Sequence, residues 1–430
     1  MKKIYALVDC NSFYVSCERL FNPSLKDKAV IVLSNNDGCA VALSKEAKSA
    51  GIKRGDPFFK IEKALEKVGG HAYSSNYSLY GDLSKRIMQV LEGTCPQMEV
   101  YSIDEAFLDL SGLEHLGLDE YGRYIKDKVY REVGLPVSVG IAHTKVLAKI
   151  ANSLAKKSSK ADGVLDLTNE RFIDVALRRT SIDDVWGIGR RSAEKLKFLG
   201  IYTALEFRDY ENDKKILKLL TKVGRQIQDE LRGINCFELE IDTRDKDQII
   251  SSKSFGRGIS DKREIKEALA CYVSRACEKM RRQNSKTRTI SIWLMTNRFS
   301  TQPQYFNEKK AVLLSASSDT RSIIVKAFEL LDDIFKEGFI YKKAGVMLSA
   351  LVEKDMSQLS FFEQGDNAKS IELMKVIDAI NEREGSESIK SLACGLDPMW
   401  KTLCERKSAH FTTRWGEILT VKMDSYKKSG

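Results

Sequence analysis

Residues 100–108 read VYSIDEAFL, an apolar strand pattern interrupted by two adjacent carboxylates, Asp104 and Glu105. A shorter apolar run, Ile4–Val8, ends at a third carboxylate, Asp9. Negative charge in an apolar strand is costly unless cations compensate it. Two divalent ions about 3.5–4 Å apart do so in phosphoryl-transfer enzymes, and oxygen ligands, including the backbone carbonyl of Cys10, suit Mg²⁺. The pattern therefore predicts a two-magnesium site, with ordinary turn residues as the alternative.

The runs around this stretch predict a split β-α-β sheet of the ferredoxin-like type. Strand patterns occupy 4–8, 29–33, 99–110 (two strands around a bend) and 136–142, whereas helical periodicity occupies 78–91, 121–133 and 144–157. A helical region follows at 169–232, and strand and helix patterns return over 242–350. Residues 363–430 have mixed helix and loop character.

Composition indicates several domains and a polyanion-binding surface. The chain has 430 residues, 30% of them charged, and a net charge of +10. Residues 251–310 hold 14 Lys and Arg against 5 Asp and Glu, which is typical of nucleic-acid binding and also of a solvated face. No apolar run suits a membrane helix or a signal peptide, so we expect a cytoplasmic protein. Nine cysteines without CxxC spacing indicate reduced thiols.

Three strings together resemble the palm of the Y-family translesion DNA polymerases: DCNSFY at 9–14, SIDEAF at 102–107 and GIAHTKVLAK at 140–149. The turn SNNDGC at 34–39 resembles the UmuC branch, the type of the catalytic subunit of bacterial DNA polymerase V. The resemblance covers nearly the whole chain. It implies an α+β multidomain fold: a ferredoxin-like palm with fingers at 1–172, a helical thumb with a helix-hairpin-helix at 173–232, a linker at 233–250, an α/β little finger at 251–352, and a clamp-binding peptide with a C-terminal tail at 353–430.

The resemblance also implies roles in an active site. Asp9, Asp104 and Glu105 match the catalytic and metal-binding acids of the family, and Cys10 matches the position that ligates through its carbonyl. Tyr14 matches the steric gate, where an aromatic ring leaves no room for the 2′-hydroxyl of a ribonucleotide. A core tyrosine is the alternative for Tyr14.

The string KEAK at 45–48 departs from the YEAR-like triphosphate grip of many family members. Lys45 and Lys48 replace Tyr and Arg, and Lys lacks the planar fork of Arg, so the detail of the grip stays open. A second triphosphate lysine has no clear match. Lys156 and Lys157 lie nearby and fit a solvated face equally well.

Two further regions are candidates for DNA binding. Residues 186–201 resemble a helix-hairpin-helix, in which Gly187 and Gly189 let the backbone approach phosphate and Arg190 opens the next helix. In the basic segment, phosphate contacts would give affinity without sequence preference. The candidates are Lys253, Arg257, Arg281, Arg282, Lys286, Arg288 and Arg298.

QLSFF at 358–362 resembles the sliding-clamp peptide, and a loop that anchors its own aromatics is the alternative. Its clamp-binding residues would be Gln358, Leu359, Phe361 and Phe362. The tail string AHFTTRW at 409–415 resembles the UmuC-type C-terminal region, with no predicted role. The implied partners are primer-template DNA, dNTP, a sliding clamp, a UmuD-type accessory protein and RecA, with no membrane.

These features predict template-directed, error-prone translesion DNA synthesis in DNA repair and SOS mutagenesis. The reaction would be two-metal nucleotidyl transfer from a dNTP to a primer 3′-hydroxyl. A two-metal nuclease or cyclase on a similar sheet is one alternative, but it needs neither a steric gate nor a clamp peptide. A non-catalytic DNA-binding subunit is another, and the intact acids Asp9, Asp104 and Glu105 argue against it.

Overall fold

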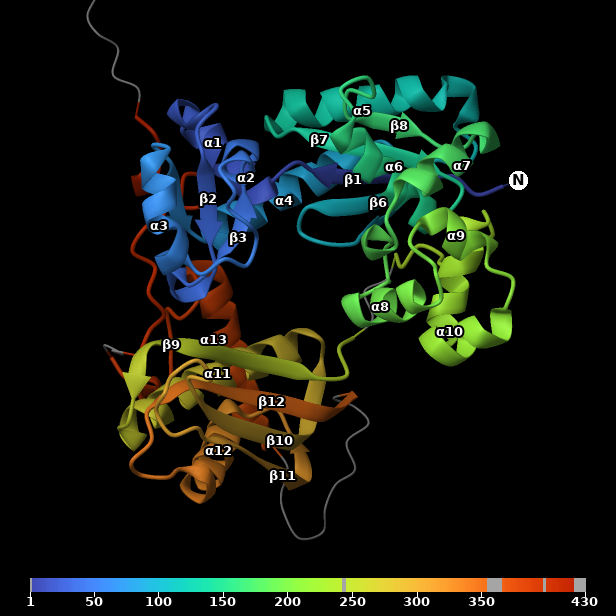
Figure 1. Cartoon of the computed structure of the whole chain (residues 1–430). Coiled ribbons are helices and arrows are strands. Elements are labelled where there is room, and N and C mark those ends of the chain that lie inside the picture. Colours follow the sequence, from blue (N-terminus) through green and yellow to red (C-terminus); the bar gives the residue numbers. More distant parts are fainter. Residues whose placement is uncertain (1, 242–244, 354–365, 397–399, 421–430) are drawn as a thin grey trace, which may run out of the picture. The chain divides into compact units, whose positions relative to one another are not determined.

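The computed structural model describes residues 2–241, 245–353, 366–396 and 400–420 (Figure 1). The chain divides into two compact units. One comprises Met1–Ser34, Gly38–Thr243 and Arg406–Gly430, and the other comprises Asn35–Asp37 and Arg244–Glu405. Residues 406–420 therefore belong to the same unit as β1 (Tyr5–Cys10), which lies far from them in the sequence. Among the described residues, no helix is long and apolar enough to cross a membrane.

A five-stranded sheet in the order β5-β6-β1-β7-β8 forms the centre of the first unit. Its strands are β1 (Tyr5–Cys10), β5 (Gln97–Val100), β6 (Glu105–Asp109), β7 (Val137–Ala142) and β8 (Val164–Asp166). β1 is antiparallel to both β6 and β7. The predicted ferredoxin-like palm is confirmed, because its four strands take the order β5-β6-β1-β7. The edge strand β8 was not predicted.

Helices cover both faces of this sheet, as Figure 1 shows: α4 (Tyr77–Glu92), α5 (Leu118–Val133) and α6 (Lys145–Lys157). Ala6 and Val8 of β1 belong to a core cluster with α4 and α5, whereas Leu7 belongs to a cluster with α6. A strand with apolar cover on both faces needs no polar alternation. This is why the first strand is a continuous apolar run up to Asp9.

A smaller sheet, in the order β3-β2-β4, lies between β1 and α4 in the sequence and corresponds to the expected fingers. Its strands are β2 (Val30–Leu33), β3 (Ala40–Leu43) and β4 (His71–Ser74), and the helices of this region are α1 (Phe13–Phe21), α2 (Lys45–Ser49) and α3 (Phe58–Lys67). β4 is the edge strand next to β2.

Four helices follow the palm, in agreement with the helical region expected over 169–232. They are α7 (Glu170–Arg179), α8 (Arg190–Phe198), α9 (Ala204–Asp209) and α10 (Asp213–Leu231). Leu177, Leu196 and Phe207 pack in one core cluster with Val146 and Ile150 of α6. The helix α6 therefore joins the palm sheet to the helical region.

The second unit is a four-stranded antiparallel sheet in the order β11-β10-β12-β9. Its strands are β9 (Ile249–Ile259), β10 (Ser285–Thr296), β11 (Phe306–Ser317) and β12 (Tyr341–Glu353). The helices α11 (Lys262–Arg282) and α12 (Thr320–Ile334) pack with the sheet around one apolar core.

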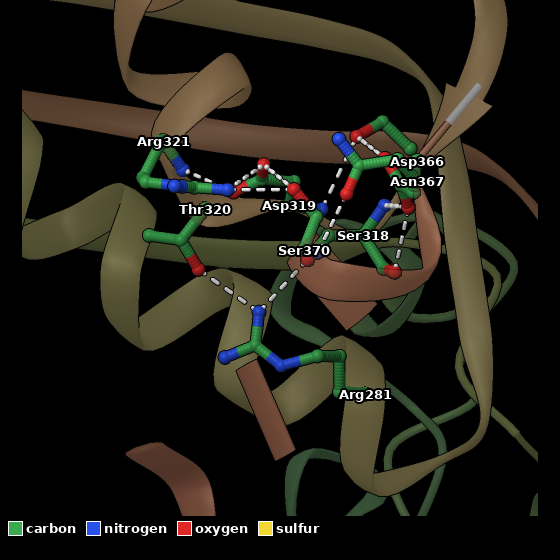
Figure 2. A network of polar contacts seen from close by, with 9 residues as sticks. Arg281, Ser318, Asp319, Thr320, Arg321, Asp366, Asn367 and Ser370 are labelled. Carbon is green, nitrogen blue, oxygen red and sulfur yellow. Dashed lines mark hydrogen bonds and ion pairs between the residues drawn. The ribbon is translucent and has the colours of Figure 1, made fainter. Parts of the chain in front are cut away.

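A third helix of this unit, α13 (Ala368–Glu384), is attached to α12 through a polar network (Figure 2). Asp366, just before α13, accepts hydrogen bonds from the Ser317 hydroxyl at 2.6 Å and from the Ser318 backbone N–H at 2.7 Å. The Ser370 hydroxyl donates to Asp319 at 2.9 Å. Asp366 and the first turn of α13 are therefore attached to the rest of the second unit by hydrogen bonds.

Candidate active site

The three carboxylates predicted from the sequence come from adjacent positions at one end of the palm sheet. Asp9 on β1 is the register partner of Glu105 on β6. Asp104 lies in the bend before β6, and its carbonyl accepts the backbone N–H of Cys10 at 2.9 Å. The antiparallel pairing of two apolar strands therefore brings together acids that lie about a hundred positions apart in the sequence.

Lysine side chains of α6 pair with two of these acids. The Lys156 Nζ lies 2.5 Å from Asp9 Oδ1, and the Lys149 Nζ lies 3.1 Å from Glu105 Oε2. Burial raises the pKa of Asp9 to about 7, although Lys156 acts to lower this pKa and the neighbouring Glu105 carboxyl raises it further. One lysine thus offsets only part of the cost of holding this carboxylate charged.

Asp104 is oriented differently from the other two acids. Its Oδ1 accepts a hydrogen bond from the Ser102 hydroxyl at 2.7 Å. Within the described ranges, no three acidic, histidine or cysteine side chains form a metal-binding group by themselves. Mg²⁺ usually takes one or two carboxylates together with substrate phosphates and water. The carboxylates present therefore suit an ion that arrives with a phosphate ligand.

A cavity of about 370 Å³ opens beside the acids, within the first unit. Its walls include Asp9, Cys10 and Asp104, together with residues from α1, β3, α2 and the loop after α2. Its basic side chains are Lys48, Arg54 and Lys156. Acidic groups and basic groups thus face one space, which suits a ligand that carries both metal ions and phosphates.

The predicted grip residues differ in their placement. Lys48 lines the cavity, whereas the exposed Lys45, in the first turn of α2, is not one of its described lining residues. Arg54, which was not among the predicted grip residues, does line the cavity. Its signal was weak, because a basic residue between two glycines, as in GIKRG at 51–55, is an ordinary turn pattern.

Lys156, which was left open between a triphosphate contact and a solvated face, points into the cavity and pairs with Asp9. The spacing of Lys145, Lys149 and Lys156 holds a signal that could have shown this. Steps of four and seven residues return to the same face of a helix. Lys149 and Lys156 therefore lie on the same side of α6, where Lys149 pairs with Glu105.

Lys145 and Thr144, from the string GIAHTKVLAK, have structural roles. The Thr144 hydroxyl caps the N-terminus of α6 by accepting the Leu147 N–H at 3.3 Å. Lys145 is 3% exposed and forms a buried ion pair with Glu99 of β5. These contacts fix the start of α6 to the palm and so set the direction in which Lys149 and Lys156 project.

Tyr14 also lines the cavity, and three other rings surround it. Its ring is stacked on Tyr80 of α4, with centroids 4.4 Å apart and planes 15° apart. Tyr77 meets it edge-on, at 6.2 Å. Ser12, just before α1, holds a left-handed backbone conformation with φ of 47°, which is rare for a residue with a side chain. Such strain is typical of functional sites, and here it sets the turn between Cys10 and Tyr14.

The expected helix-hairpin-helix lies in the helical part of the first unit. Gly187 has φ of +84°, and a Cβ there would lie 2.5 Å from Ile227, so this position requires glycine. Gly189 is the N-cap of α8 and provides no side-chain cap. Arg190, at the first position of α8, is paired with Glu194 at 3.1 Å. The uncapped N–H groups of α8 are available to an anion such as a DNA phosphate.

The basic residues of the second unit differ in exposure and in their ion-pair partners. Arg257 and Arg282 pair with Glu264 and Glu278, Arg288 is exposed, and Lys286 is buried. Burial lowers the pKa of Lys253, with Arg275 acting in the same direction. Arg298 lies 5.9 Å from the ring of the exposed Phe299.

The structure removes Arg281 from the set of predicted DNA contacts. Its side chain is 14% exposed and forms a two-pronged ion pair with Asp378 of α13, at 2.6 and 2.7 Å. Its third nitrogen donates to the Ser318 carbonyl and the Thr320 hydroxyl, each at 2.9 Å (Figure 2). With its donors already used inside the unit, Arg281 links α11, α12 and α13 and is not free to contact phosphate.

The clamp-peptide residues Gln358, Leu359, Phe361 and Phe362 lie outside the described residues, so the predicted clamp contact stays a prediction.

Comparison with known proteins points to one group. Residues 8–153 match the impB/mucB/samB family, residues 246–361 match its C-terminal domain, and residues 372–421 match a domain of unknown function. Protein UmuC of Salmonella typhimurium (strain LT2) is 41% identical over 97% of this chain and all of its own length. Protein SamB of Salmonella typhimurium is 39% identical over 98% of this chain and all of its own length.

More distant similarity extends to DNA polymerase IV 2 of Bacillus subtilis, which is 29% identical over 90% of this chain and 93% of its own length. Among solved structures, a Y-family DNA polymerase chimera of Dbh and Dpo4 superimposes with a TM-score of 0.64, at 22% identity, over 81% of this chain and 99% of that chain. An insertion ternary complex of Dbh DNA polymerase superimposes with a TM-score of 0.53, at 23% identity, over the same shares.

Proposed function

This chain belongs to the impB/mucB/samB family of UmuC-type, Y-family DNA polymerases, and from that membership we infer that the cavity beside Asp9 and Asp104 is its nucleotidyl-transfer site. The chain is an enzyme of template-directed, error-prone translesion DNA synthesis, and its family depends on divalent metal ions. The observation that carries the assignment is the meeting of acids, basic side chains and an aromatic ring around one cavity.

Two Mg²⁺ ions would be held by Asp9, Asp104, Glu105 and the carbonyl of Cys10. The residues fit such ions, because burial and the proximity of Glu105 raise the pKa of Asp9, and added positive charge would relieve both effects. When bound, the ions would activate the primer 3′-hydroxyl and neutralise the triphosphate. Lys48, Arg54 and Lys156 line the same cavity and supply fixed positive charge to orient the phosphates.

Tyr14 discriminates between sugars in this proposal. Its ring faces the cavity and is held from behind by Tyr80, so a 2′-hydroxyl would meet a ring that has no space to retreat. A nuclease or cyclase would have no use for this arrangement. The helix-hairpin-helix before α8 and exposed cations such as Arg288 would grip the DNA backbone without reading its sequence.

Several assignments complete the proposal. We assign palm and fingers to 1–172, thumb to 173–232, linker to 233–250, little finger to 251–352 and the tail to 353–430. QLSFF at 358–362 would bind a sliding clamp. A UmuD-type accessory protein and RecA are the further partners that family membership implies.

Primer extension tests the site directly. Asp104→Ala and Glu105→Ala should each lower single-nucleotide extension by at least about a thousandfold, since metal-bound carboxylates support several kcal/mol of transition-state stabilisation. Primer-template affinity, measured by fluorescence anisotropy, should change little because the proposed DNA grip lies elsewhere. The exposed acid Glu114 offers a control, Glu114→Ala, with normal extension expected. Normal extension by both active-site variants would disprove the assignment.

A further inference from the structure

The segment 406–411, near the end of the chain, lies against the fingers within the first unit. Arg406 and Ser74 exchange hydrogen bonds: the Ser74 N–H donates to the Arg406 carbonyl at 3.0 Å, and the Arg406 N–H donates to the Ser74 hydroxyl at 3.0 Å. Ser74 and Lys407 form an isolated parallel bridge, so this segment pairs with the end of the edge strand β4. The guanidinium of Arg406 pairs with Glu62 at 2.9 Å and lies 5.0 Å from the Phe58 ring.

The same segment fixes the start of α4. Asn76, the N-cap residue of α4, is fully buried. Its side-chain nitrogen lies 3.1 Å from the Ser408 carbonyl, 3.0 Å from the Ser408 hydroxyl and 3.1 Å from the Ala409 carbonyl. The next residue, Tyr77, meets the Tyr14 ring edge-on. The tail therefore positions the first turn of the helix that carries one neighbour of the proposed gate.

A second line of contacts runs through a buried carboxylate. The Ser408 hydroxyl donates to Glu18 Oε1 at 3.0 Å, and the Tyr80 hydroxyl donates to the same oxygen at 2.6 Å. Glu18 is 2% exposed. A buried carboxylate depends strongly on its hydrogen-bond donors. Tyr80, oriented by this bond, stacks on Tyr14 at 4.4 Å.

A third contact attaches the tail to α1, the helix that carries Tyr14 and Glu18. Phe411 stacks on Phe21 in the last turn of α1, with centroids 4.8 Å apart and planes 11° apart. The tail thus touches both helices, α1 and α4, whose rings surround the gate position. None of the hydrogen bonds and ring contacts described for the tail itself is made to a residue that lines the cavity.

We propose that the segment 406–411 is a positioning strap for the steric gate: through Ser408, Glu18 and Tyr80 it holds the ring of Tyr14 in the plane that excludes a ribose. This inference rests on the proposed role of Tyr14 and extends it to the matched domain of unknown function, whose last part contains the strap. Ser408 and Tyr80 are positioning residues, since they act on the nucleotide only through Tyr14.

The strap is needed because stacked aromatic rings can slide past each other at little cost in energy. An offset stack permits a sliding motion unless the polar end of one ring is fixed. The hydroxyl of Tyr80 is fixed by Glu18, and Glu18 is fixed in turn by Ser408. Without Ser408, Glu18 keeps one hydroxyl donor of the two that the described contacts provide, and the Tyr80–Tyr14 stack gains freedom to shift away from the sugar.

The test compares kcat/KM for a deoxynucleotide and the matching ribonucleotide in the full-length chain. Ser408→Ala should raise ribonucleotide kcat/KM so that discrimination falls about 3- to 10-fold, which corresponds to the loss of one ordinary intramolecular hydrogen bond. Deoxynucleotide kcat should stay near its original value. Ser408→Thr, which keeps the hydroxyl, should restore discrimination. Ser24→Ala, which removes a hydroxyl bonded to Asn22 at 2.6 Å on the exposed surface, is the matched control with no change expected.

Two further variants make each outcome decisive. Tyr80→Phe breaks the bond to Glu18 while keeping the ring and the whole tail, so it should lower discrimination even if Ser408→Ala fails to fold. Tyr14→Ala tests the gate itself and should lower discrimination much further. Unchanged discrimination in Tyr14→Ala would overturn the gate and the strap together.

If Tyr14→Ala loses discrimination while Ser408→Ala and Tyr80→Phe retain it, the gate stands and the strap is refuted. An equal loss of kcat/KM for both nucleotides in the Ser408 and Tyr80 variants would also refute it, because a tail that only stabilises the fold cannot produce a gain for ribonucleotides.

Discussion

Gly140→Ala offers a sharp test of the architecture beneath the active site. Gly140 lies on β7, where α6 crosses the sheet at very close range. An added Cβ would lie 2.1 Å from the Asn152 backbone nitrogen and 2.4 Å from the Ala148 carbonyl oxygen, whereas ordinary contacts begin at 3.4 Å. Both obstacles are helix backbone, which no rotamer change can remove. The helix must therefore recede by roughly 1 Å or more, given the close packing of protein interiors.

The expected cost follows from this displacement. Overpacking a core costs about 1–3 kcal/mol and occasionally more, and a clash with helix backbone belongs at the upper end, at about 3 kcal/mol. For a domain of this size, such a loss lowers Tm by about 6–12 °C. Extension should also fall by about a hundredfold in the folded protein, because a 1 Å misplacement carries that order of penalty. The helix α6 carries Lys156, whose Nζ lies 2.5 Å from Asp9.

Circular dichroism melts and single-nucleotide extension below the transition would measure the two effects separately. Gly81→Ala is the matched control: Gly81 lies inside α4 with nothing within 4 Å of its added Cβ. Alanine in an open helical site should stabilise the chain by about 0.5–1 kcal/mol. A Gly140→Ala protein with an unchanged Tm and normal extension would show that α6 does not approach β7 as described. The same result would refute the placement of Lys156 beside Asp9.

Two predictions concern the other parts of the chain. Replacing Gln358, Leu359 and Phe362 together by Ala should leave extension of a bare primer unchanged and abolish stimulation by a sliding clamp, because buried apolar anchors contribute about 1.5–3 kcal/mol each. Loss of extension in the absence of the clamp would instead show that the segment is part of the core. Arg281→Ala should destabilise the second unit by about 1–3 kcal/mol, because it removes the ion pair with the half-buried Asp378 and the hydrogen bonds to Ser318 and Thr320. Arg288→Ala should instead weaken duplex binding, measured by salt-dependent anisotropy, with little change in Tm; the reverse pattern would contradict the positions of these two arginines.

Local sequence patterns were sufficient to predict much of the architecture. Apolar runs ending at Asp9 and surrounding Asp104 and Glu105 predicted two strands, and the order of elements around them predicted the ferredoxin-like palm. These strands can be recognised from the sequence because a strand buried on both faces is continuously apolar. The short edge strand β8, Val164–Asp166, escaped notice because three residues carry no periodicity.

Basic side chains show where such patterns fail. Residue type makes every one of five cations a candidate phosphate ligand: Lys45, Lys48, Arg54, Lys156 and Arg281. The structure directs Lys48, Arg54 and Lys156 into the cavity, and it uses the donors of Arg281 inside the second unit. A long cationic side chain can reach in many directions from one backbone position, so its target depends on which elements pack beside it.

The sequence by itself indicated the kind of chemistry and the elements that carry it, because acids that end or interrupt apolar strands favour compensating cations and the strings around those acids resemble the Y-family palm. Only the tertiary structure decided which residues complete the site. It brought Ser408 within 3.0 Å of Glu18, across 390 positions of sequence, and it placed a tail for which no local pattern predicted a role against α1 and α4. Contacts at such separation leave no periodic trace in the chain, since they depend on which surfaces remain to be covered after the strands and helices have packed.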